Sequence, residues 1–107
     1  MNVLFVCSQN KLRSPTAAQV FADEPGIETD SAGTNRGAEV ELCEEHILWA
    51  DVIFAMEPEH IRRIRTKFRK LLRNQRLICL GIPDDYGFMD PALVSLLRKK
   101  VTPHLKR

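Results

Sequence analysis

Short apolar segments alternate along the chain with longer segments of mixed character. Residues 2–6 form a continuous apolar run rich in β-branched and aromatic side chains, the pattern of a strand covered on both faces. Ser14 and Pro15 then signal a helix start, because serine caps free amides and proline suits a first turn. Similar signals recur to the end of the chain. They predict strands at 2–6, 27–31, 51–55 and 77–80, helices at about 14–23, 40–49, from 57 to about 76 and from 91 to about 105, and a loop at 81–89.

Strands that alternate with helices of ten or more residues indicate a parallel sheet covered on both faces. We therefore expect the α/β class, as a flavodoxin-like three-layer sandwich with a four-stranded parallel sheet in the order 2-1-3-4. In that arrangement ligands bind beyond the carboxyl end of the first strand, where Cys7 lies. With 107 residues and no repeat or linker, residues 1–107 are expected to form a single domain.

The overall composition and charge restrict the classes of protein to which the chain can belong. The formal net charge of +2 is too small to indicate a nucleic-acid or membrane partner by itself. Three cysteines without paired spacing, and no apolar run of membrane-spanning length, predict a reduced, soluble, cytoplasmic protein. His46, His60 and His104 fall on separate predicted helices without metal-ligand spacing, so we expect no metal site and solvent-facing imidazoles.

The polar segment 7–14 carries the candidate chemistry. It leads from a strand into a helix N-terminus, so its backbone amides can converge on one point where the helix dipole adds positive charge. Arg13 adds a planar fork that matches two oxygens of a phosphate. A thiol facing these groups should ionise easily, helped by the Ser14 hydroxyl, which would make Cys7 a nucleophile. The alternative is that Cys7 is only a small apolar residue closing the strand.

Several motifs resemble those of one enzyme family, the low-molecular-weight protein tyrosine phosphatases. Residues 7–15, CSQNKLRSP, resemble the family's phosphate-binding loop, which reads cysteine, two residues, asparagine, two residues, arginine, serine and proline. Residues 30–34, DSAGT, resemble its turn after the second strand, and residues 50–56 with His60 resemble its third strand and next helix. Residues 82–87, IPDDYG, resemble its acid loop. These motifs span nearly the whole chain, which looks like a short variant of the family.

The resemblance implies a phosphate monoester hydrolase, in the first place a protein tyrosine phosphatase. Its substrate would be a phosphotyrosine protein or a small aryl phosphate, with inorganic phosphate as product and no metal or cofactor. Cys7 would form a cysteinyl-phosphate, Arg13 would hold the phosphate oxygens, Asn10 would brace the loop and Ser14 would favour the thiolate. The implied phosphate-binding set is Ser8, Gln9, Asn10, Lys11, Leu12 and Ser14.

The mechanism also needs an acid to protonate the departing phenol. Asp84 is predicted for this role, because the loop after the fourth strand lies at the same sheet edge as the loop after the first. Asp85 and Asp90 remain alternatives, although Asp90 before Pro91 is also an ordinary helix cap. Tyr86 either lines the substrate cleft or packs on its own turn.

Other functions remain open. Segment 59–76 carries eight Lys and Arg against one acidic residue, so a basic helix there could bind RNA or an acidic partner. Its apolar residues recur at helical spacing, which also fits a plain amphipathic helix, and without an aromatic stacking set a nucleic-acid partner is disfavoured.

The chain could also be a phosphate-binding module without turnover. Thiol-dependent arsenate reductases share this fold and loop but need further cysteines near the acid loop, and residues 81–90 contain none. We expect Cys43 to lie on a helix and Cys79 to be buried in the fourth strand.

Overall fold

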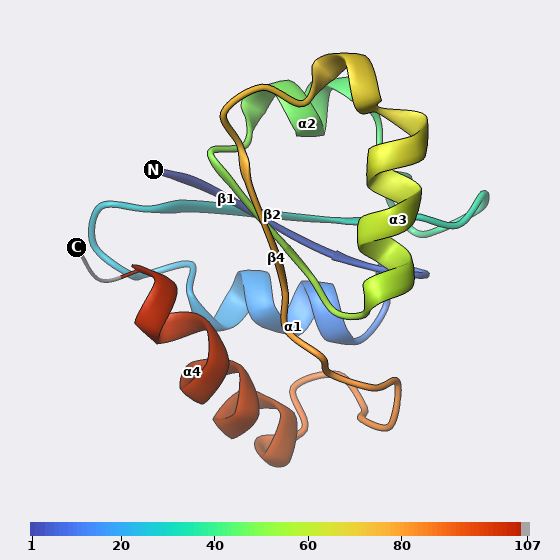
Figure 1. Ribbon diagram of the computed structural model, residues 1–107. Coiled ribbons are helices and arrows are strands. Elements are labelled where there is room, and N and C mark those ends of the chain that lie inside the picture. The colour runs from blue at the N-terminus through green and yellow to red at the C-terminus, as the bar shows by residue number, and fades with distance from the viewer. Residues whose placement is uncertain (106–107) are drawn as a thin grey trace.

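A computed structural model describes residues 1–105, and its core is one parallel sheet (Figure 1). The four strands are hydrogen-bonded in the order β2-β1-β3-β4, which confirms the predicted topology. The strands are β1 (Asn2–Cys7), β2 (Glu28–Gly33), β3 (Val52–Ala55) and β4 (Arg76–Cys79). The helices are α1 (Arg13–Val20), α2 (Glu44–Trp49), α3 (Pro58–Lys67), a short 3₁₀ helix η1 (Arg69–Leu71) and α4 (Pro91–Leu105).

The central strand β1 supplies both hydrophobic cores. Phe5 and Cys7 point to the side on which α1 and α4 pack, where the buried residues include Phe21, Phe54 and Leu97. The alternate side chains of β1 face α2 and α3 in a second cluster. Figure 1 shows α1 and α4 on one side of the sheet and α2 and α3 on the other. The predicted three-layer, flavodoxin-like α/β arrangement is therefore confirmed.

The basic segment 59–76 is not one helix, which corrects the sequence prediction. Helix α3 ends at Lys67, and after Phe68 the 3₁₀ helix η1 turns the chain back toward the sheet. Phe68 is buried in the core, and Arg76 already pairs with Val52 in the ladder between β3 and β4. The apolar positions keep their helical spacing beyond Lys67, but the need to bury Phe68 and to return to the sheet edge ends the helix there.

The predicted helix at 40–49 is also shorter than expected, because α2 begins only at Glu44. The chain before it runs beside the end of β2: Gly33 donates its amide to the Val40 carbonyl and accepts from the Leu42 amide, each at 2.8 Å. Leu42 is buried by this bridge. Residues 34–42 thus stay at the carboxyl edge of the sheet, where the candidate loop lies. Among residues 1–105, no helix combines the length and the apolar character needed to cross a membrane.

Candidate active site

Segment 34–39 anchors the loop between β1 and α1 through hydrogen bonds to the loop carbonyls. The carbonyls of Cys7, Ser8 and Gln9 accept hydrogen bonds from the amides of Thr34, Asn35 and Glu39, at 2.9, 3.0 and 2.9 Å. In the described part of the chain, by contrast, no amide of residues 8–12 donates to a protein group. The carbonyls are therefore used for anchoring, and the amides remain available to a ligand.

Asn10 turns the loop back on itself. Its φ of 55° lies in the left-handed region that asparagine tolerates better than most residues. The same side chain accepts a hydrogen bond from the Ser14 hydroxyl at 2.8 Å, and Ser14 Oγ lies 3.0 Å from Cys7 Sγ. Ser14 was expected to cap α1, but α1 begins at Arg13 with Leu12 in the cap position. The hydroxyl of Ser14 is directed to the thiol instead, and all three side chains are buried.

Arg13 is the buried cation of the site. Its Nη1 donates to Glu57 Oε1 at 2.5 Å and to the Ile82 carbonyl at 2.8 Å, which uses both hydrogens of that nitrogen. Within residues 1–105 no hydrogen bond uses Nη2, and Nε is buried without one, with Asp84 Oδ1 3.6 Å away. An unsatisfied buried donor is costly, so this edge of the guanidinium is suited to an anionic ligand.

His60, in the first turn of α3, supports the loop from the other side. Its Nδ1 accepts from the Glu57 amide at 3.1 Å, so the neutral ring carries its hydrogen on Nε2, which donates to Ser8 Oγ at 2.9 Å. Burial lowers the pKa of His60, and Arg13 lowers it further, against the opposing effect of Glu57 and Glu59. The imidazole was expected to face solvent, but it is buried because it joins α3 to the loop.

Residues of the loop, together with Arg13 and Asp84, enclose a small pocket at the carboxyl edge of the sheet. Its volume is about 80 Å³, and it is lined by Cys7, Ser8, Gln9, Lys11, Leu12, Arg13 and Asp84. Since a water molecule takes about 30 Å³ in the liquid, the space suits one phosphoryl group with the remainder of a substrate outside. Of the sequence-predicted phosphate-binding residues, Asn10 and Ser14 lie behind the loop and do not line the pocket.

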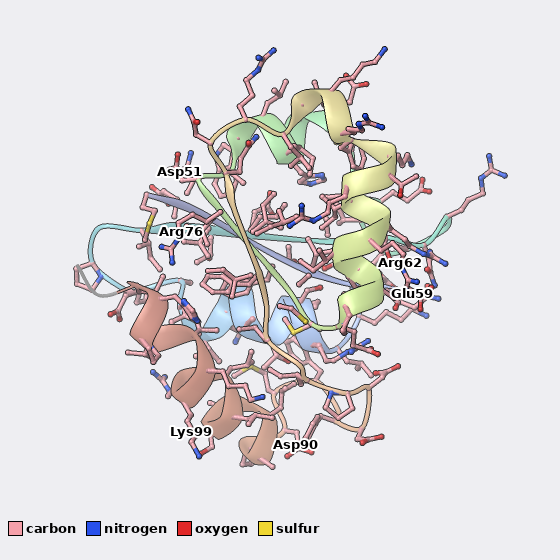
Figure 2. The ribbon with its side chains drawn as sticks, in the orientation of Figure 1. Asp51, Glu59, Arg62, Arg76, Asp90 and Lys99 are labelled. Carbon is pink, nitrogen blue, oxygen red and sulfur yellow. The ribbon has the colours of Figure 1, made fainter. Side chains whose placement is uncertain are left out.

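The three candidate acids have different positions. Asp84 is exposed and lines the pocket, whereas Asp85 is exposed outside it. Asp90 lies at the start of α4, where Figure 2 labels it, and its Oδ1 accepts from the Ala92 amide at 2.9 Å. It therefore acts as the helix cap that its place before Pro91 suggested. Tyr86 does not line the pocket; it packs against the core cluster under α1 and α4.

The other two cysteines lie apart from the pocket. Cys43 was expected to lie on a helix but is the extended residue before α2, and Cys79 ends β4, the edge strand. Both are exposed, so the expectation that Cys79 is buried is wrong: β4 has a neighbour on one side only. Neither cysteine lines the pocket with Cys7.

Sequence reasoning missed three supports of the site: Glu57, His60 and the Ile82 carbonyl. Glu57 precedes Pro58 and was taken only as a helix start, and His60 was noted as part of a family-like stretch and as a solvent-facing histidine. A backbone carbonyl gives no side-chain signal at all. All three follow β3 or β4 in the chain, so their approach to the loop after β1 depends on the strand order.

Comparison with known proteins identifies this fold. No protein-family model and no curated protein sequence matches the chain. Among solved structures, the YwlE arginine phosphatase from Geobacillus stearothermophilus is 24% identical, with a TM-score of 0.76 over 97% of this chain and 92% of that one. The tyrosine phosphatase Wzb from Escherichia coli K30 is 17% identical, with a TM-score of 0.76 over 96% of this chain and 94% of that one. SP-PTP, a low-molecular-weight protein tyrosine phosphatase from Streptococcus pyogenes, is 17% identical, with a TM-score of 0.78 over 97% and 90%. The chain thus has the fold of the low-molecular-weight protein tyrosine phosphatases.

Proposed function

We propose that the protein hydrolyses phosphate monoesters through a cysteinyl-phosphate on Cys7, with phosphotyrosine residues or small aryl phosphates as substrates. One observation carries this proposal: the Cys7 thiol, loop residues whose amides bond to no described protein group, and Arg13, whose Nε makes no hydrogen bond, line one pocket. The fold shared with known phosphatases supports it.

In the first step the phosphate dianion binds to the loop amides and to Nε and Nη2 of Arg13. The Cys7 thiolate attacks phosphorus, so that an S–P bond forms while the P–O bond to the phenol breaks. Asp84, at the mouth of the pocket, donates a proton to the departing oxygen. The loop amides and Arg13 stabilise the charge on the equatorial oxygens during the transfer.

In the second step water attacks the cysteinyl-phosphate. Asp84, now a carboxylate, takes a proton from that water, inorganic phosphate leaves and the thiolate is restored. A half-turn of the Asn10 amide would let its NH₂ donate to Ser14, leaving the hydroxyl hydrogen free for the sulfur of the thiolate. Ser14 then stabilises the same charge at the start and at the end of the cycle.

Phosphoarginine is a second candidate substrate. Among the solved structures with this fold is an arginine phosphatase, and the exposed carboxylate of Asp84 in the pocket lining, with that of Asp85 next to it in sequence, suits a guanidinium. The apolar side chain of Leu12, which lines the mouth, favours the phenyl ring of phosphotyrosine instead. Two phosphopeptides of equal length, one with each modified residue, distinguish these candidates by their kcat/KM.

Turnover of p-nitrophenyl phosphate tests the reaction itself. Cys7→Ala is expected to abolish hydrolysis, while Cys43→Ala, which removes an exposed thiol outside the pocket, retains it. Acid quenching during turnover should trap one phosphoryl group on the peptide that contains Cys7, detected by mass spectrometry. Equal rates for wild type and Cys7→Ala, or no hydrolysis by the wild type, would refute the proposal.

A further inference from the structure

A basic groove follows the exposed side of α3. Two hollows adjoin there, of about 480 Å³ and about 750 Å³, and they share Thr66 and Lys67 in their linings. We call this pair of hollows the α3 groove. The first is lined by Thr34, Glu59, Arg62, Arg63, Thr66 and Lys67. The second is lined by Glu44, Thr66, Lys67, Phe68, Arg69, Lys70 and Leu71.

The α3 groove carries positive charge that the protein does not neutralise. Its lining contains five cationic side chains and two carboxylates. Arg63 is held by Glu59 at 3.5 Å and by Asn35 Oδ1 at 2.8 Å. Arg62 and Lys67 form no ion pair with any residue of the described chain. An anionic ligand is therefore the class that fits.

The groove begins beside the proposed catalytic pocket. Thr34, in its wall, donates its amide to the Cys7 carbonyl, and His60 at the start of α3 bonds to Ser8. In Figure 2, Glu59 and Arg62 lie on the half of α3 that starts at this edge of the sheet. A helix rises about 1.5 Å per residue, so Lys67 lies roughly 10 Å along the axis from His60, the length of about three residues of extended peptide.

We propose that the α3 groove binds acidic side chains of the substrate, about one to five positions from the phosphorylated residue. This inference rests on the proposed function, because the phosphate in the pocket fixes where the flanking residues lie. A peptide fits better than RNA, since the one aromatic residue of the lining, Phe68, is buried and offers no face for base stacking.

The test compares two phosphotyrosine peptides that differ only in Glu or Gln at the flanking positions. Arg62→Ala/Lys67→Ala removes two of the four groove cations that form no ion pair within the described chain, namely the two that lie on α3. Arg98→Ala/Lys99→Ala removes the same charges from the exposed side of α4, and Figure 2 shows Lys99 on that helix, away from α3. All three proteins are assayed with both peptides and with p-nitrophenyl phosphate, which is too small to reach the groove.

At low salt the wild type should favour the acidic peptide by about 3- to 10-fold in kcat/KM, the size expected for two exposed charge contacts. The preference should disappear in Arg62→Ala/Lys67→Ala and shrink at high salt, where the Debye length falls to a few ångströms. It should persist in Arg98→Ala/Lys99→Ala, and all three proteins should hydrolyse p-nitrophenyl phosphate at the same rate.

Equal rates for both peptides, or a preference that survives loss of Arg62 and Lys67, would overturn the groove assignment while leaving the hydrolase intact. A labelled RNA that displaces the acidic peptide from the wild type, but does not bind Arg62→Ala/Lys67→Ala, would overturn the choice of partner. Failure of the wild type to hydrolyse p-nitrophenyl phosphate would refute the proposed function, and the groove proposal with it.

Discussion

The junction between Gly33 and the candidate loop gives the sharpest quantitative prediction. Gly33 ends β2, and a Cβ atom there would lie 2.6 Å from the Ser8 carbonyl oxygen, 2.6 Å from Ala38 Cβ and 3.0 Å from the Asn10 amide nitrogen. Two of these three atoms belong to the backbone of the loop. Gly33→Ala therefore perturbs the loop by packing, without removing any group from the pocket.

The size of the effect follows from these distances. Ordinary contacts begin at about 3.4 Å, so the Ser8 oxygen and the added methyl group must separate by a further 0.8 Å. Ser8 is held by hydrogen bonds to Asn35 and His60, so the strain passes into the loop amides. A misplacement of about 1 Å costs on the order of 100-fold in rate, or about 2.7 kcal/mol of transition-state stabilisation. Overpacking of this kind should also destabilise the fold by about 1–3 kcal/mol.

The assay is kcat/KM with p-nitrophenyl phosphate, together with competitive inhibition by inorganic phosphate and the melting temperature. Gly87→Ala is the matched control, because a Cβ at that position meets nothing within 4 Å. Gly33→Ala should lose about 100-fold in kcat/KM and bind phosphate more weakly, while Gly87→Ala stays near wild type. A folded Gly33→Ala protein with wild-type kcat/KM and phosphate affinity would refute the reasoning.

Three further predictions concern the charged groups around the pocket. Arg13→Lys should reduce kcat/KM by at least about 100-fold, because a point charge cannot replace the fork; a smaller loss with p-nitrophenyl phosphate would count against the bidentate contact. Asp84→Ala should lower kcat by about 100-fold, whereas Asp90→Ala should leave kcat unchanged and cost about 1 kcal/mol of stability by chemical denaturation; the reverse pattern would make Asp90 the acid. His60 has a pKa lowered from 6.5, so the unfolded chain takes up a proton there first as pH falls. Its contribution to stability is complete above pH 6.5 and is lost below it, by at most about 1.4 kcal/mol per pH unit down to the folded-state pKa. Urea unfolding above and below pH 6.5 should show this slope, and an identical slope in His60→Gln would contradict it.

The sequence was most informative where structure and chemistry are local. The apolar run of β1 predicted a central strand, and the cysteine, arginine and helix start that follow it lie within one continuous segment. Asp84 could also be placed, because the carboxyl ends of parallel strands meet at one edge of the sheet. Each of these inferences needed only neighbouring residues or the strand order, and the strand order was predicted correctly.

Element boundaries were less predictable, and segment 59–76 shows why. Helical spacing of apolar residues continues past Lys67, so the local pattern contains no stop signal there. The stop comes from the sheet, because the chain must reverse before Arg76 can pair with Val52. The consequence is functional: the basic residues line two adjoining hollows instead of one straight helical face.

The supports of Arg13 show the limit of a local motif most clearly. Glu57 and Ile82 are 44 and 69 residues away in sequence, yet both bond to the same guanidinium nitrogen. Glu57 comes from the end of β3 and Ile82 from the end of β4, so the two contacts depend on the placement of these strands beyond β1. Because both hydrogens of Nη1 are taken by the protein, the fork can turn only its other edge to the pocket. The motif thus determines which residues can meet a phosphate, while the strand order determines which nitrogens of Arg13 remain free to bind it.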